Sequence, residues 1–330
     1  RDADVVKAEL QANRPVQMEM AWPLPSPDDR VEYDLWTVPT DVVSKDFLTE
    51  FKDLAIALGN RAYFTPHMYI YDGTRFGCLG RDGENECSNL CTNNGRYCAL
   101  SAGNDQDSGI SGADVVRESL RRICIWNHYG ATDGIGEVWW DYVGDFMTRC
   151  SLPDNFGNSD CINDAYQHAN VDGPTIDSCM SDSGGLENDT PNTFLDLEIS
   201  SRSQRGVVTV PTLFVNTVAI RGRLAADTAF HAICAAYATG SAPEVCRTCG
   251  GNCQNPTGCI ENGGDCSPTT NTTPSLPSPS SSLSPPSSST TTPSSLLMIH
   301  IPDSLFKEGG YDHRQSLFGM PPYGGSISQN

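Results

Sequence analysis

The residues with the greatest capacity for chemistry are the fourteen cysteines of the 330-residue chain. Only Cys246 and Cys249 have the CxxC spacing of a redox or zinc motif, and no second cysteine pair or histidine pair completes a zinc tetrad. An even and high cysteine count is typical of an oxidising compartment, and fourteen cysteines predict up to seven disulfides. The disulfide candidates are Cys78, Cys87, Cys91, Cys98, Cys124, Cys150, Cys161, Cys179, Cys234, Cys246, Cys249, Cys253, Cys259 and Cys266.

The other reactive residue types lack the spacing that a catalytic or metal site requires. The six histidines are scattered without an HxxxH or HExxH pattern, and no GxSxG, P-loop, Rossmann glycine or EF-hand motif occurs. Acidic residues are numerous, but in a chain with a net charge of −20 most of them are expected to form a solvated surface. We therefore expect a protein that is not an enzyme, with no catalytic residues, no cofactor and no bound metal.

The charge balance also limits the partners of the chain. With 21 basic and 41 acidic residues, it is not expected to bind nucleic acid or an anionic membrane, because both need a basic surface. No run of 18 apolar residues exists, so no membrane span is expected. The chain begins at Arg1 without an initiator methionine or a signal peptide, which predicts a processed chain or a piece of a longer one. Its expected location is extracellular or the lumen of the secretory pathway.

The fold prediction is built around the segment GVVTVPTLFVNTVAIRGRL, residues 206–224. Proline cannot donate a hydrogen bond to a sheet, so Pro211 must open a strand or lie on an edge. A Val-Pro-Thr hairpin followed by a helix from about Ala225 is typical of the second half of a thioredoxin fold, in which the proline is cis. Pro211 is thus a structural cis-proline candidate. The alternative is an ordinary edge-strand proline in another α/β domain.

The first half of the same fold precedes this hairpin. Residues 31–36 and 64–71 have the pattern of strands, and residues 45–58 have that of an amphipathic helix. A redox-active thioredoxin fold carries a cysteine pair at the start of its first helix, where the helix dipole lowers the thiol pKa. Residues 37–44 contain no cysteine. The sequence therefore predicts a redox-dead thioredoxin-like domain, an α/β fold, over residues 31–245.

An insertion at about residues 74–200 is predicted within this domain. Its first part is rich in Gly, Asn and Cys, shows no core pattern and needs disulfide staples. Its later part has the pattern of helices over residues 112–126 and 136–150. The second helix carries an aromatic stripe that includes Trp139 and Trp140, which we interpret as core rather than as a binding surface.

The cysteines after the closing helix predict a further small element. Five cysteines within residues 246–266 indicate a disulfide knot of the epidermal-growth-factor-like type. Cys234 and Cys246 bracket the turn that precedes it and could pair with each other, which leaves four cysteines for the knot.

Residues 267–295 consist almost entirely of Ser, Thr and Pro and cannot bury a core, so a rod or linker is predicted there. Asn188 and Asn271 stand in N-glycosylation sequons. The O-glycosylation candidates are Thr269, Thr270, Ser278, Ser280, Ser284, Ser287, Ser288, Thr290, Thr291 and Thr292. Residues 1–30 and 296–330 are too short to close a core and are interpreted as parts of domains.

Several motifs occur in an order that points to one family. They are FTPHMYIY, CTNNGRYC, VWWDYVGDFMTRC, VTVPTLFVN and CIENGGDC. Over about residues 28–266 the chain resembles the luminal region of plant-type vacuolar sorting receptors. The resemblance implies a cysteine-rich thioredoxin-like domain followed by EGF-like repeats, which together bind sorting determinants on soluble cargo. It also implies that residues 1–30 and 296–330 are the end and the start of a protease-associated domain, in circularly shifted order. The knot lacks the acidic pair expected ahead of a calcium-binding repeat.

Two partial domains, a Ser/Thr/Pro rod and many disulfides favour a structural subunit of an extracellular glycosylated filament, of the algal flagellar-hair or glycofibril type. The partners would then be glycans and further copies of the chain, joined head to tail. The subunit-contact candidates are Leu296, Leu297, Ile299 and Ile301 on one copy and Val16, Met18 and Met20 on the next. The alternative is the luminal cargo-binding region of a vacuolar sorting receptor, with sorting peptides as ligands. A third hypothesis, an oxidoreductase of the secretory pathway, is disfavoured by the missing cysteine pair.

Overall fold

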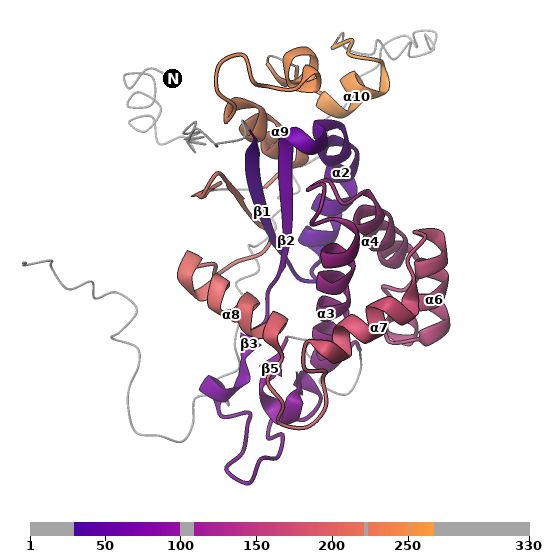
Figure 1. The fold of residues 1–330 in the computed structure, drawn as a ribbon, viewed down its shortest axis with the longest axis vertical. Coiled ribbons are helices and arrows are strands. Elements are labelled where there is room, and N and C mark those ends of the chain that lie inside the picture. Colours follow the sequence, from indigo (N-terminus) through magenta and orange to yellow (C-terminus); the bar gives the residue numbers. More distant parts are fainter. Residues whose placement is uncertain (1–29, 100–108, 221–223, 252, 267–330) are drawn as a thin grey trace, which may run out of the picture. The chain divides into compact units, whose positions relative to one another are not determined.

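The computed structural model shows the chain as two units (Figure 1). The first unit is Arg1–Asn271, and the second is Thr272–Asn330. The residues that the structure describes all belong to the first unit and are 30–99, 109–220, 224–251 and 253–266.

Several predictions fall on residues 1–29 and 267–330, which lie outside the described residues. They are the two partial domains, the Ser/Thr/Pro rod, the sequon at Asn271, the O-glycosylation candidates and the subunit-contact candidates.

A four-stranded sheet with the order β2-β1-β6-β7 forms the centre of the described region. Its strands are β1 (Val31–Thr37), β2 (Ala62–Met68), β6 (Thr212–Val215) and β7 (Val218–Ala219). β1 and β2 run parallel, so the chain must cross over between them, and helix α2 (Val42–Leu58) makes that connection. β6 runs antiparallel to β1 and turns directly into β7.

The second strand differs from the prediction for residues 64–71 and spans Ala62–Met68. Its end is set by its partner, because the last residue of β1, Thr37, pairs with Met68 and leaves no ladder beyond it.

Helix α2 covers one face of this sheet, as its residue pattern predicts. The helix begins after Asp41, whose side chain accepts a hydrogen bond from the first turn. Its buried side includes Phe47, Phe51, Leu54 and Leu58. On the sheet, the rings of Tyr33 and Phe64 stack with centroids 5.1 Å apart, and Phe51 meets Tyr33 edge to face. Buried and less buried residues alternate along β1 and β2, and the buried aromatic residues of the two strands form this layer of the core.

The inserted segment is largely helical and extends the core on the α2 side of the sheet (Figure 1). The insertion contains helices α3 (Gly112–Tyr129), α4 (Glu137–Arg149), α5 (Pro153–Phe156), α6 (Ser159–His168), α7 (Gly173–Asp182) and α8 (Thr193–Arg205). Helices α9 (Ala226–Ala235) and α10 (Pro256–Glu261) follow the hairpin of β6 and β7. The interpretation of the α4 aromatics as core is confirmed, since Trp139 and Trp140 are both buried. Trp140 stacks on Phe64, with ring centroids 4.8 Å apart.

A second, small sheet lies in the cysteine-rich first part of the insertion. Its strands are β3 (Tyr71–Asp72), β4 (Cys91–Thr92) and β5 (Tyr97–Cys98), in the order β3-β5-β4. The short 3₁₀ turns are η1 (Gly59–Arg61), η2 (Gly73–Phe76), η3 (Ser88–Leu90) and η4 (Asn93–Gly95). The disulfide Cys91–Cys98 joins β4 to β5, and Cys78–Cys87 closes the loop between β3 and β4. These bonds stabilise a region with few apolar side chains.

The predicted knot packs against the domain rather than standing apart from it. After the Cys234–Cys246 disulfide come a π-helical turn, η5 (Cys246–Gly250), and helix α10. Both contact α9, and α10 also contacts α2. Four cysteines of this segment are buried in the main core: Cys246, Cys249, Cys253 and Cys259. The segment is therefore continuous with the thioredoxin-like core.

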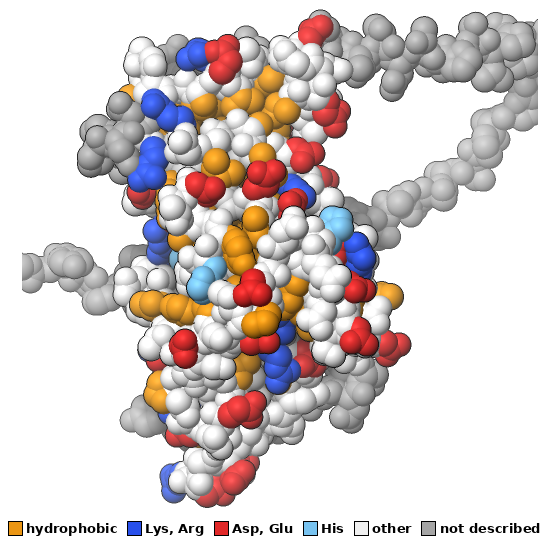
Figure 2. All heavy atoms as spheres, turned by 45° about the vertical axis from the view of Figure 1, so that its right-hand side comes forward, with side chains coloured by type: hydrophobic (Ala, Val, Ile, Leu, Met, Phe, Trp, Pro, Cys, Tyr) orange, Lys and Arg blue, Asp and Glu red, His pale blue; other side chains and the backbone are white. Residues whose placement is uncertain are grey.

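The surface of the described region carries mainly acidic charge. On the face shown in Figure 2, acidic side chains are spread among uncharged ones, and basic side chains occur singly or in small groups. Of the helices described, none has both the length and the apolar character needed to cross a bilayer.

Candidate functional site

The cis-proline lies at one end of the central sheet. The Val210–Pro211 peptide bond is cis, and the next residue, Thr212, pairs with Trp36 near the end of β1. From Trp36 the chain needs only a short loop to reach the start of α2 at Val42. The cis-proline segment and the first turn of α2 therefore approach the same end of the sheet.

The first turn of α2 is closed by a side-chain pair and contains no thiol. Asp41 accepts hydrogen bonds from the backbone N–H and the hydroxyl of Ser44, both at 2.6 Å. Asp41 and Ser44 stand three residues apart at the helix start, and residues 37–44 contain no cysteine. Between them, Val42 and Val43 are 66% and 54% exposed. Trp36, near the end of the preceding strand β1, is buried. The exposed apolar surface at this end of the sheet therefore begins with Val42 and Val43 of the helix.

All fourteen cysteines are joined in disulfides, and no free thiol exists in the chain. The seven bonds are Cys78–Cys87, Cys91–Cys98, Cys124–Cys179, Cys150–Cys161, Cys234–Cys246, Cys249–Cys259 and Cys253–Cys266. Cys246 and Cys249, the CxxC pair, bond to different partners. Two groups of three sulfur atoms come close together in the described residues, but each sulfur is already in a disulfide and offers no thiolate to a metal.

A buried aromatic cluster lies behind the cis-proline, on the sheet face opposite α2. Trp36, Val207 and Phe214 form it, and Tyr69 and Val210 pack against it. Trp36 is fully buried, and its ring lies parallel to the imidazole of His67, with centroids 4.3 Å apart.

His67 lies between two carboxylates and connects helix α8 to the sheet. Its Nδ1 is 3.1 Å from Glu198 Oε1 on α8, and its Nε2 is 3.8 Å from Asp34 Oδ1 on β1. Glu198 also accepts a hydrogen bond from the backbone N–H of Met68 at 2.9 Å, and Arg205 pairs with Asp34 at 2.7 Å. Burial alone would lower the pKa of His67, but hydrogen bonds and the charges of both carboxylates outweigh it and raise the pKa to about 9. The imidazole therefore stays protonated across the neutral and acidic range.

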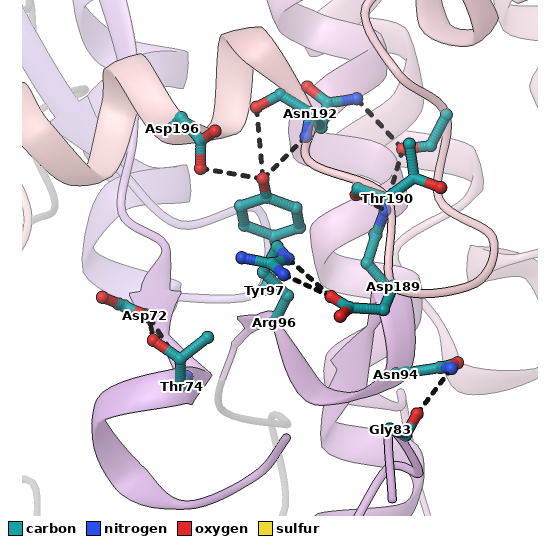
Figure 3. Close-up of polar contacts among 12 residues, drawn as sticks. Asp72, Thr74, Gly83, Asn94, Arg96, Tyr97, Asp189, Thr190, Asn192 and Asp196 are labelled. Carbon is teal, nitrogen blue, oxygen red and sulfur yellow. Dashed lines mark hydrogen bonds and ion pairs between the residues drawn. The ribbon is translucent and has the colours of Figure 1, made fainter. Parts of the chain in front are cut away.

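The other end of α8 is held by a second polar cluster, shown in Figure 3. The Tyr97 hydroxyl donates to Asp196 at 2.8 Å and accepts from the backbone N–H of Asn192 at 2.7 Å. Asn192 caps α8 by accepting from the N–H groups of the first turn. Arg96 pairs with Asp189 just before this cap. Helix α8 is thus anchored at both ends by hydrogen bonds and charges.

The two polar anchors were not predicted from the sequence. Residues 67 and 198 are 131 positions apart, so no local pattern connects them. The one available signal is the alternation in β2, which places His67 on the opposite face from Phe64 and Met68. Asn188, the N-glycosylation candidate within the described residues, is exposed in the loop before α8 and has a left-handed backbone with φ of 54°.

A shallow hollow of about 300 Å³ lies away from this end of the sheet. It is lined by His128, Pro174, Thr175, Ser178, Cys179 and Asp182. It shares no residue with the cis-proline segment, the α2 start or the two polar anchors.

Comparison with known proteins gives a consistent family. The family model described as "Vacuolar sorting receptor thioredoxin-like domain" matches residues 31–234. Vacuolar-sorting receptor 1 of Pisum sativum is 34% identical over 265 residues, which cover 76% of this chain and 41% of the receptor. Vacuolar-sorting receptor 7 of Arabidopsis thaliana is 35% identical over 278 residues, which cover 80% of this chain and 43% of the receptor. This chain therefore spans less than half the length of these relatives.

Among solved structures, an oxidized DsbA1 mutant aligns at 10% identity with a TM-score of 0.36, over 66% of this chain and 87% of that chain.

Proposed function

This chain belongs to the vacuolar sorting receptor thioredoxin-like domain family, and from that premise we propose that it is a cargo-binding part of a receptor's luminal region. Its fold is thioredoxin-like, with a mixed sheet, covering helices and multiple disulfides. The family match over residues 31–234 is the observation that carries the proposal. The ligands we propose are sorting peptides on soluble cargo proteins.

The preferred interpretation of the sequence, a structural subunit of a glycosylated filament, is wrong. The family model and the curated relatives are sorting receptors, which favours the alternative. The filament hypothesis depended on the two terminal segments and the Ser/Thr/Pro rod, whereas the family match depends on the folded domain itself. A composition that suits a rod does not identify an assembly.

The proposed location is the lumen of the secretory pathway. Seven disulfides with no free cysteine suit an oxidising compartment. We also keep, as a proposal from the sequence alone, that residues 1–30 and 296–330 are segments of a protease-associated domain.

We propose that the domain binds without catalysing a reaction, and in particular that it is redox-dead. The support is the first turn of α2, where Asp41 and Ser44 contact each other and no cysteine occurs in residues 37–44. A carboxylate hydrogen-bonded to a hydroxyl cannot exchange disulfides, because neither group can form a bond to sulfur by thiolate attack.

The cis-proline end of the sheet is the peptide-binding surface we propose. Val208 is 74% exposed there, and Val42 and Val43 add exposed apolar surface at the start of α2. The backbone N–H groups of residues 208–210 have no hydrogen-bond partner among the described residues. An extended peptide could pair with such free backbone groups and place apolar side chains against the valines.

The experiment that tests this function is calorimetric titration of the full chain with a synthetic sorting peptide, with a scrambled peptide as control. We expect saturable binding of the first and none of the second. Equal binding of both peptides, or binding of neither, would refute the proposed function.

A further inference from the structure

Arg202, in the last turn of α8, is held by two aromatic rings. Its guanidinium carbon lies 4.5 Å from the centroid of the Tyr69 ring and 5.1 Å from that of Tyr71. Both distances are within the range of a cation–π contact. The side chain is half-buried, so it is ordered by the rings and still reaches the surface.

No carboxylate among the described residues lies within ion-pair distance of Arg202. Glu198, one turn earlier on α8, has the spacing to pair with it. However, that carboxylate contacts His67 and accepts from the N–H of Met68 instead. The Nη1 atom of Arg202 is enclosed and has no hydrogen-bond partner in the described part of the chain.

This situation is unusual in a chain with a net charge of −20. Other arginines around α8 and in the helical core have carboxylate partners: Arg96 with Asp189, Arg121 and Arg122 with Glu118, and Arg205 with Asp34. Arg202 is thus an oriented cation that no carboxylate of the described residues pairs with.

The position of Arg202 connects it to the proposed peptide surface. Tyr69, on which its guanidinium lies, packs against the cluster of Trp36, Val207 and Phe214. Val210, the first residue of the cis peptide bond, packs against the same cluster. Arg202 therefore borders the surface at which we place the peptide.

We propose that Arg202, with Tyr69 and Tyr71, forms a subsite for a carboxylate group of the bound peptide, an inference that rests on the proposed function. A guanidinium group presents a planar fork of N–H donors that matches a carboxylate in two parallel hydrogen bonds. The two rings hold the plane of the fork in advance, which reduces the entropy lost on binding.

The neighbouring tyrosine suits this chemistry. Burial, and then the charge and the hydrogen bond of the neighbouring Tyr69, raise the pKa of Tyr71 above its ordinary value, so Tyr71 stays neutral and does not itself neutralise the guanidinium.

Two sources of carboxylate fit this subsite, the C-terminus of a peptide and an acidic side chain. Three tetrapeptides with a common Ala-Ala-Leu-Val core separate them: one with a free C-terminus, one amidated, and one amidated with an aspartate in place of the second alanine. Binding of the first identifies a C-terminal carboxylate, and binding of the third identifies a side chain. The amidated neutral peptide is expected to bind at least about tenfold more weakly than whichever form is recognised.

The direct test is nuclear magnetic resonance of the full chain labelled at arginine, with the Arg202 Nε–H signal followed during titration with sodium acetate and, as an ionic-strength control, sodium chloride. We expect a saturable shift with acetate alone. The variants Arg202→Gln and Arg202→Lys should each weaken binding of the recognised peptide at least about tenfold, because neither side chain keeps the fork. The control Arg81→Gln changes the same charge on the exposed cysteine-rich loop and should have no effect.

The outcomes separate this inference from the proposed function. Peptides that bind both Arg202 variants as tightly as the wild type would overturn the subsite and leave the receptor function standing. An acetate shift at Arg202 without binding of any peptide would support the carboxylate site and refute the receptor function. Absence of both signals would overturn both. Should Arg202→Gln fail to fold, the acetate titration of the wild type alone decides whether the site exists.

Discussion

Trp36 and His67 lie face to face across β1 and β2, with ring centroids 4.3 Å apart and planes within 7° of parallel. The imidazole is protonated, so the stack places a positive charge on the face of the indole ring. The same imidazole contacts Glu198 of α8. One histidine thus joins the aromatic cluster behind the cis-proline to the helix that covers it.

His67 should make stability depend on pH on the alkaline side of neutrality. Its folded-state pKa of about 9 lies above the ordinary value of 6.5, so its stabilising contribution is complete below pH 6.5 and is lost as the pH rises through 9. Over that interval the free energy of unfolding should fall by up to about 3 kcal/mol more in the wild type than in His67→Gln. Urea unfolding at several pH values in non-reducing buffer measures this free energy for both proteins. The exposed His128, changed to Gln, is the matched control, and an identical pH slope in wild type and His67→Gln would contradict the network.

Tyr97→Phe should loosen the start of α8. The change removes a hydroxyl that accepts from the buried N–H of Asn192, and that N–H would lose a partner at a cost of about 1–3 kcal/mol. The comparison variant is Tyr129→Phe, since the Tyr129 hydroxyl accepts from the exposed N–H of Asp172 and water can replace it. Thermal unfolding should show the larger loss for Tyr97→Phe; equal losses would mean that the cap cluster of Figure 3 contributes no more than a surface contact.

The wild-type chain should not accelerate the reduction of insulin by dithiothreitol, because the first turn of α2 contains no thiol. The double variant Asp41→Cys with Ser44→Cys places a CxxC pair at the helix start and should acquire measurable activity. Wild-type activity would contradict the redox-dead proposal. A folded double variant that forms its new disulfide and remains inactive would show that this turn lacks the geometry that exchange requires.

Val42→Asp combined with Val43→Asp should weaken binding of the sorting peptide by about tenfold or more, since it replaces exposed apolar surface by charge. Acidic residues are favourable in the first turn of a helix, so α2 should remain folded. The matched control is Leu152→Asp, because Leu152 is 64% exposed and stands at the start of α5. Calorimetry should show weaker binding for the double variant alone. If the double variant and the control bind alike, the peptide surface is elsewhere.

The elements with strong patterns could be predicted from the sequence. The stripe of α2 and the aromatics of α4 bury apolar side chains at helical spacing, and Pro211 marks the hairpin by its missing donor. Helix α8 gave a weaker signal about where it packs, because its inward side combines the apolar Leu195 and Ile199 with Glu198 and Arg202. Its placement depends on charges far apart in sequence, which a periodicity analysis does not connect.

The cysteine-rich C-terminal segment shows the same limit. Its spacing predicts disulfides, but it does not show that Cys249 and Cys259 are buried where this segment meets α9 and α2. The spacing of cysteines indicates that disulfides form, but only the folded structure shows which helices those disulfides pack against.

Hydrogen–deuterium exchange of the full chain, with and without the sorting peptide, shows whether the peptide binds at the cis-proline end of the sheet. The free N–H groups of residues 208–210 should exchange fast alone and slow down on binding, together with the first turn of α2 around Val42 and Val43. Protection confined to other regions, or none at saturating peptide, would show that the peptide does not bind at this end of the sheet.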